Sequence, residues 1–290
     1  MNEKDEILPL GVMTGLGMDS YKSLAKVRDF GLHTCQLGNP PDEYVYGERS
    51  EELTQKLKDA IKKTGVKISS VFIMYKGHIW NLIDGPKTIG LVPEETRAVR
   101  VVHACAMSNW AKKAGISVVT SHIGFIPVDA GTNLYKGFIE TMKEFVKFCK
   151  SNGQLFAFET GQETPKVLRR TIDDIGMDNV RVNLDSANIL LYGMGKPLEA
   201  VEAFGEFVVN THIKDGKWPT EPGKLGHEFP IGEGDVHYEE LLPALYKKGF
   251  RGPLTIEREI SGDQQIKDIK KAVEILEGIK AKLLKNGKID

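Results

Sequence analysis

Cysteine, surplus charge and long apolar runs are all scarce in this chain of 290 residues. Its three cysteines, Cys35, Cys105 and Cys149, are too widely spaced to form a metal or disulfide framework, and this is typical of a reducing compartment. The formal net charge is -1, so no basic field favours nucleic acid or acidic lipid. Composition therefore predicts no nucleic-acid partner.

No apolar run approaches the roughly 18–20 residues that a membrane helix needs. The first residues, MNEKDE, are charged and lack the apolar core of an export signal. We therefore expect a cytoplasmic protein with no membrane partner, and export stays open if a signal was trimmed from the chain. No linker rich in Gly, Ser or Pro divides the sequence, so we expect one domain over residues 1–290.

Short apolar runs alternate with longer amphipathic segments along the whole chain. Strands are expected at 8–13, 34–37, 66–73, 117–122, 155–159, 180–185, 207–212 and 254–257. Helices are expected at 20–30, 51–64, 94–114, 135–152, 165–175, 197–204, 238–248 and 266–284. Strands that alternate with helices imply parallel crossovers, and eight such units in under 300 residues favour a closed (β/α)8 TIM barrel over an open sheet.

Charged or imidazole side chains stand at the ends of five consecutive expected strands. In a parallel barrel these carboxyl-terminal ends meet at one face, where active sites lie. Alone, each residue reads more simply as a capping or solvated loop residue, but their common position predicts a shared site. The positions two residues earlier, on the same face of each strand, are all small or polar. The five residues are His122, Glu159, Asp185, His212 and Glu257, and the earlier positions are Thr120, Ala157, Asn183, Asn210 and Thr255.

Four of these residues form a plausible ligand set. Two glutamates, an aspartate and a histidine at one point would repel one another without a cation. Oxygen ligands with one imidazole suit a divalent Mn²⁺, Mg²⁺, Co²⁺ or Zn²⁺, and the lack of thiolates argues against a structural zinc. We therefore predict a single catalytic metal with open positions for an oxygen-rich substrate.

Residues near the strand ends are candidates for substrate contacts. Lys214 shares a strand face with His212 and is expected to hold a substrate oxygen, with a salt bridge to a nearby acid as the alternative. His122 is expected to contact substrate or support the ligands. His227 lies in the longest irregular stretch, 215–235, where it would close over the substrate or remain a solvated loop residue.

The remaining polar and aromatic residues receive simpler interpretations. Among the three tryptophans, Trp218 is best placed to stack on a sugar, whereas Trp110 is expected to pack within a helix and Trp80 is left open. Arg258 should face away from the barrel interior by strand alternation, which indicates a structural role. Asp215 is expected only to anchor the stretch that follows it.

The motifs FET, NLDSAN, THIKDG, PIGEGDV and IERE resemble the xylose isomerase-like TIM-barrel superfamily. That superfamily includes sugar isomerases and epimerases, inosose dehydratases and the endonuclease IV class of nucleases. Its ketose 3-epimerases bind one metal through residues that match Glu159, Asp185, His212 and Glu257. The resemblance also implies that Glu159 and Glu257 form the acid–base pair. The HIKD and GEGDV stretches are similar to the inosose dehydratase members and to members described as isomerases.

Two departures from the family pattern bear on function. Asn188 stands where epimerases have a substrate-contacting histidine, so it is the candidate contact here. The trinuclear nuclease pattern also needs that histidine and an aspartate ligand where this sequence has Leu225, so a three-metal site is incomplete here. We expect a metal-dependent isomerase or epimerase acting on a ketose or keto-polyol, with a dehydratase or other lyase as the alternative. A nuclease or a non-catalytic sugar-binding protein ranks below both. The absence of a phosphate-binding glycine loop favours a non-phosphorylated sugar, and the resemblance allows a homo-oligomer.

Overall fold

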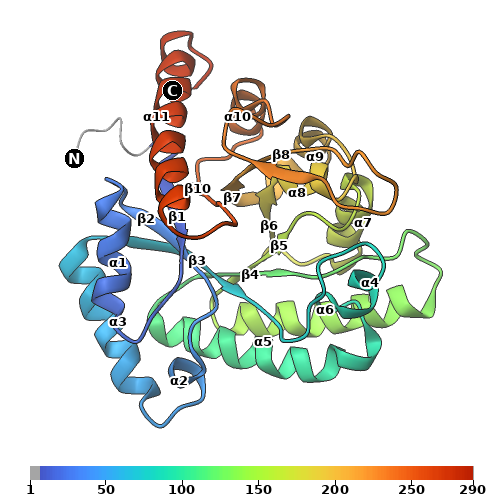
Figure 1. Ribbon diagram of the computed structural model, residues 1–290. Coiled ribbons are helices and arrows are strands. Elements are labelled where there is room, and N and C mark those ends of the chain that lie inside the picture. Colours follow the sequence, from blue (N-terminus) through green and yellow to red (C-terminus); the bar gives the residue numbers. More distant parts are fainter. Residues whose placement is uncertain (1–6, 290) are drawn as a thin grey trace.

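The computed structural model describes residues 7–289, and within them eight parallel strands close into a barrel (Figure 1). This confirms the predicted (β/α)8 fold. The strands are β1 (Leu10–Thr14), β2 (Thr34–Leu37), β3 (Lys67–Ile73), β4 (Val118–His122), β5 (Leu155–Glu159), β6 (Val180–Asp185), β7 (Val208–Ile213) and β10 (Leu254–Ile256). Around the barrel each pairs with its neighbour along this list, and β10 pairs with β1.

Helices surround the barrel and follow the predicted segments closely. The main ones are α1 (Ser20–Asp29), α3 (Ser50–Thr64), α5 (Glu94–Ala114), α6 (Asn133–Ser151), α7 (Pro165–Ile175), α9 (Pro197–Phe204), α10 (Tyr238–Lys247) and α11 (Asp263–Lys285). Shorter helices are α2 (Asp42–Val45), α4 (Gly85–Thr88) and α8 (Ser186–Leu191). Gly115 ends α5 with φ of 79°, a left-handed conformation that glycine adopts without steric cost. No helix within residues 7–289 is long and apolar enough to cross a membrane.

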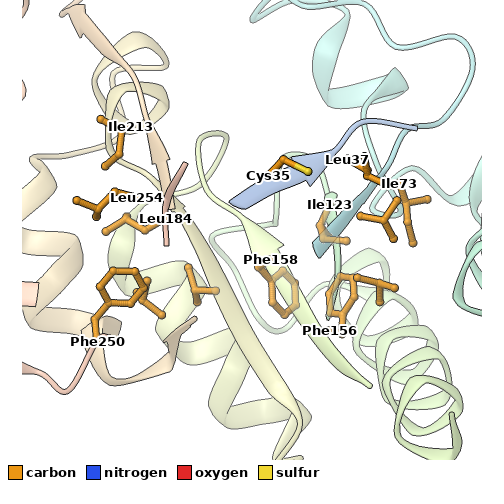
Figure 2. Close-up of a cluster of buried hydrophobic side chains, with 14 of the residues drawn as sticks. Cys35, Leu37, Ile73, Ile123, Phe156, Phe158, Leu184, Ile213, Phe250 and Leu254 are labelled. Carbon is orange, nitrogen blue, oxygen red and sulfur yellow. The ribbon is translucent and has the colours of Figure 1, made fainter. Parts of the chain in front are cut away.

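The apolar core lies between the strands and the helices, and Figure 2 shows part of it. Phe156 and Phe158 alternate with inward-facing residues of β5 and pack edge to face, with ring centroids 5.1 Å apart. Phe145 of α6 packs on Phe156 at 5.2 Å. Burial of such large apolar side chains is the main stabilising contribution to the fold. The same alternation leaves the barrel interior to polar residues, which build the site described below.

The stretch 215–235, predicted to be irregular, contains a short antiparallel hairpin of β8 (Asp215–Lys217) and β9 (His227–Phe229). The prediction was wrong here because three-residue strands carry too little alternation to be recognised. Asp215 holds the segment together. Its carboxylate accepts N–H groups from Gly232 and Val236, at 2.9 Å and 3.0 Å, and also from Gly216 and Gly234. Its predicted anchoring role is confirmed.

Candidate metal centre and substrate cavity

Three buried side chains converge where β5, β6 and β7 end. Glu159, Asp185 and His212 each offer one ligand atom, and these atoms all lie within 4.8 Å of one another. His212 Nδ1 is 2.8 Å from Glu159 Oε1 and 3.9 Å from Asp185 Oδ2. None of these three atoms has a hydrogen-bond partner within the described part of the chain. Buried polar atoms without partners are rare because they are costly, so their shared focus fits a bound cation.

The other polar atom of each of these residues is held by the protein. Glu159 Oε2 accepts a hydrogen bond from Asn183 Nδ2. Asp185 Oδ1 caps α8 by accepting the Asn188 N–H at 2.8 Å. His212 Nε2 pairs with the Gln36 Oε1 atom. One atom of each side chain is therefore fixed, and the other points to a common centre.

Glu257 follows β10 and supplies a fourth candidate ligand. Its Oε2 lies 3.3 Å from His212 Nδ1. Unlike the three residues above, its side chain is 16% exposed and lines the adjoining cavity. The structure thus brings together all four predicted ligands, and Glu257 is the one that faces the space a substrate would enter.

Lys214 is buried among acids beside this centre. Its side chain is only 1% exposed, and its Nζ lies 2.9 Å from Glu259 Oε1, 3.3 Å from Glu257 Oε2 and 3.5 Å from Asp185 Oδ2. It also donates to Asn188 Oδ1 at 3.1 Å. Burial lowers the pKa of Lys214, but the carboxylates of Asp185, Glu257 and Glu259 outweigh burial and hold that pKa well above its usual value. Lys214 is therefore a fixed cation.

The acids and the imidazole of the centre are unevenly charged. Burial raises the pKa of Asp185 to about 8, although Lys214 opposes this rise. Burial also raises the pKa of Glu257, but His212 and Lys214 outweigh it and keep that pKa below its usual range. Burial lowers the pKa of His212, but Glu159 and Glu257 outweigh burial and hold that pKa well above 6.5. A divalent cation would favour the ionised carboxylates and the neutral imidazole, and so would displace these protons.

A cavity of about 450 Å³ opens beside Glu257. Its charged lining residues are Glu228, Glu257 and Glu259, and no lysine or arginine of the described chain lines it. Its polar and apolar walls are His122, Asn188, Met13, Gly38, Phe72, Met74, Trp80, Leu191, Tyr192, Leu225 and Gly226. The space is the right size for a small molecule, and both apolar and acidic residues line it.

His122 and Trp80 form one side of this cavity. Their ring centroids are 5.0 Å apart, and Phe72 lies 5.4 Å from His122. Burial lowers the pKa of His122 to about 3, so its imidazole is neutral at physiological pH. A neutral imidazole can donate one hydrogen bond to a substrate hydroxyl and accept another.

The other predicted aromatic and loop residues lie elsewhere. His227 is exposed on β9 and is not among the residues that line the cavity. Trp218 is 44% exposed and lines a separate hollow beside Lys196. Trp110 is buried and donates to Thr54 Oγ1 at 3.1 Å, as its expected packing role requires. The structure therefore brings Trp80, rather than Trp218, to the cavity.

Arg258 turns away from the barrel interior, as predicted, and links three elements. It pairs with Asp268 of α11 at 2.8 Å and with Glu228 of β9 at 3.0 Å. Glu228 also accepts the N–H of Glu259 at 3.1 Å. Arg258 thus ties the β8–β9 hairpin, which forms part of the cavity wall, to the segment after β10.

Sequence reasoning missed Gln36, Glu228 and Glu259. Gln36 lies on β2, far from any motif, and its only signal was an amide inside a buried strand. Glu228 follows His227, and Glu259 lies two residues after Glu257. The directions in which their side chains point depend on the β8–β9 hairpin.

The family model for the xylose isomerase-like TIM barrel matches residues 24–279. The chain belongs to this family. A crystal structure of a xylose isomerase domain protein from Planctomyces limnophilus is 32% identical, covers 96% of this chain and 99% of that one, and superimposes with a TM-score of 0.89. An uncharacterized protein of Methanocaldococcus jannaschii is 26% identical over 173 residues, 55% of either chain. The match therefore spans about half the length of that relative.

Other solved structures share the fold at lower identity. A xylose isomerase-like TIM barrel protein from Mycobacterium smegmatis, in complex with magnesium, is 17% identical with a TM-score of 0.72, covering 98% of this chain and 100% of that one. A D-tagatose 3-epimerase-like protein is 20% identical with the same TM-score, covering 96% and 98%. Structures named as an L-ribulose 3-epimerase and a probable 3-DHS dehydratase of Bacillus anthracis also match. At these identities the likeness shows the fold alone.

Proposed function

We propose that this protein is a divalent-metal-dependent sugar isomerase or epimerase that moves a proton next to the carbonyl of a ketose or keto-polyol. The proposal rests on the convergence of Glu159, Asp185 and His212 atoms, each without a hydrogen bond in the described part of the chain, beside a cavity that Glu257 lines. These residues would hold Mn²⁺, Mg²⁺, Co²⁺ or Zn²⁺. Such a cation, when bound, would polarise the substrate carbonyl and make the adjacent C–H more acidic.

The two glutamates would then move the proton. Glu257 faces the cavity, and its neighbours His212 and Lys214 keep it ionised, so it is suited to accept a proton from the substrate. Glu159 Oε1 lies 2.8 Å from His212 Nδ1, and Asn183 orients the Glu159 carboxylate. The family resemblance assigns it the second role in the pair, the return of a proton, although it lies deeper than Glu257 and does not line the cavity. Lys214 fixes Glu257 and Asn188 in place, because it is buried behind them and does not line the cavity.

The cavity walls support a neutral substrate. Its charged lining residues are acids, and the cations that contact Glu259 and Glu228, Lys214 and Arg258, are paired with those carboxylates. A phosphate would bring further negative charge without a free cation to meet it. Trp80 offers an aromatic face for the C–H groups of a sugar ring, while His122 and Asn188 offer hydrogen bonds to its hydroxyls.

Solvent deuterium exchange tests the proposal. The protein loaded with Mn²⁺ or Mg²⁺ is incubated in heavy water with a panel of free ketoses and keto-polyols, and the products are followed by mass spectrometry and NMR. Deuterium uptake without loss of water is the expected result. Loss of water mass would instead identify the lyase. Exchange that persists unchanged after Glu257→Gln, or no exchange with any member of the panel, would overturn the proposal.

A further inference from the structure

We propose that Gln36 is a positioning residue which, together with Asn183, forms a directional chain of hydrogen bonds that decides which nitrogen of His212 faces the metal. The inference rests on the metal site proposed above. Gln36 lies on β2, which contributes none of the four candidate ligands. Its side chain crosses the barrel interior to reach His212 on β7, a strand that does not neighbour β2.

The direction of the chain is set at its carboxylate end. An ionised carboxylate only accepts hydrogen bonds, so the atom of Asn183 that contacts Glu159 Oε2 must be the donating Nδ2. Asn183 Oδ1 then faces Gln36 and accepts from its Nε2 at 3.3 Å. Gln36 must therefore present Oε1 to His212, where only an Nε2–H can pair with it.

This orientation of Gln36 determines the state of the other imidazole nitrogen, His212 Nδ1. When the ring is neutral it carries one proton, and Gln36 Oε1 keeps that proton on Nε2. The lone pair is then on Nδ1, the atom that lies 2.8 Å from Glu159 Oε1 and 3.3 Å from Glu257 Oε2. Without the acceptor on Gln36, the neutral ring could place its proton on Nδ1 instead, which would block the ligand atom.

Neighbouring residues hold Gln36 itself in one orientation. The four residues of this hydrogen-bond chain are all buried: Glu159, Asn183, Gln36 and His212. Gln36 Nε2 also donates to Ser70 Oγ, which accepts a further hydrogen bond from Asn210 Nδ2 at 3.3 Å. Two acceptors thus occupy the amide nitrogen, and a flip of the amide would place Nε2 against His212 and leave Oε1 facing Asn183 Oδ1.

Metal affinity is the first readout. Isothermal titration with Mn²⁺ would compare the wild type with Gln36→Met, which removes the acceptor, and with Gln36→Glu, which keeps it. We expect Gln36→Met to weaken binding by about 10- to 100-fold, the usual effect of losing such a supporting partner, and Gln36→Glu to restore most of the affinity. Thr255→Val is the matched control. Thr255 is buried in the same polar layer, and within residues 7–289 its hydroxyl bonds only Asn210 Oδ1, at 3.1 Å, so loss of the hydroxyl should change affinity less than twofold.

The second readout is the imidazole itself. In the Zn²⁺-loaded protein with ¹⁵N-labelled histidine, the His212 ring proton should sit on Nε2 and exchange slowly with solvent, and Gln36→Met should make its exchange fast. If Gln36→Met leaves both the metal affinity and the exchange rate of the ring proton unchanged, Gln36 does not set the tautomer of His212. A wild type that binds no divalent cation would overturn the metal site instead, so the two failures are distinguishable.

Discussion

The Nζ of Lys214 lies 3.3 Å from Glu257 Oε2, and the lysine side chain is only 1% exposed. Few lysines are buried to this degree, and here the charge is retained because Asp185 and Glu259 also face it. The arrangement supports the ionised form of Glu257 from behind while leaving its carboxylate open to the cavity. We therefore expect Lys214 to affect both the stability of the fold and the protonation state of Glu257.

Replacing Lys214 with methionine should destabilise the metal-free protein by about 3 kcal/mol, because it leaves buried carboxylates without their cation. The matched control is Lys282→Met. Lys282 pairs with Glu239 at 2.9 Å, the same distance as Lys214 to Glu259, but the Lys282 side chain is 67% exposed. That change should cost no more than about 0.5 kcal/mol. Urea unfolding with a chelator present gives both values, and equal losses would show that burial of Lys214 does not matter.

Glu257→Gln and Glu159→Gln should each lower the rate of deuterium exchange by at least about 10²-fold, since each removes a group that accepts or donates the proton. The amide keeps the size of the side chain and one oxygen. The melting temperature therefore serves as a check on folding, and product NMR supplies the rate. If both variants turn over a confirmed substrate as fast as wild type, the acid–base assignment is wrong.

Glu163, a buried residue between β5 and α7, provides a test in the pH dependence of stability. Burial raises its pKa to about 8, opposed by backbone N–H groups and reinforced by Glu159. A raised folded-state pKa means that the folded protein holds this proton longer than the unfolded chain does. Its contribution to stability is full below about pH 4.5 and is lost as pH rises towards 8. Glu163→Gln should flatten this fall by about 1 kcal/mol per pH unit, as urea unfolding between pH 5 and 8 would measure. Parallel curves for variant and wild type would contradict the assignment.

The barrel and the grouping of the candidate ligands were predictable because both follow from regular periods. Strand alternation puts every second residue inside, and parallel pairing brings the ends of β5, β6 and β7 to one face, so Glu159, Asp185 and His212 had to meet. Nothing in local spacing marked Gln36, because its partner His212 is distant in the sequence and the bond crosses the barrel.

For loop residues, the position relative to the cavity could not be predicted, for a different reason. Trp218 and His227 belong to a hairpin whose direction depends on Asp215 and the glycines it binds, not on hydrophobic period. Adjacent residues of a strand face opposite sides, so when Glu228 turns towards Arg258, His227 turns away from the cavity. Trp80 reached the cavity from the connection after β3, where no repeated pattern fixed its position.

We expect Glu159, Asp185, His212 and Glu257 together to bind one divalent cation. Anomalous diffraction from crystals grown with Mn²⁺ tests it most directly, with Asp185→Asn as the comparison. We predict a single strong peak per chain, bounded by these four side chains and with His212 Nδ1 as the nitrogen ligand, and a much weaker peak in the variant. No peak at this position in the wild type, or a peak bounded by other residues, would contradict the account.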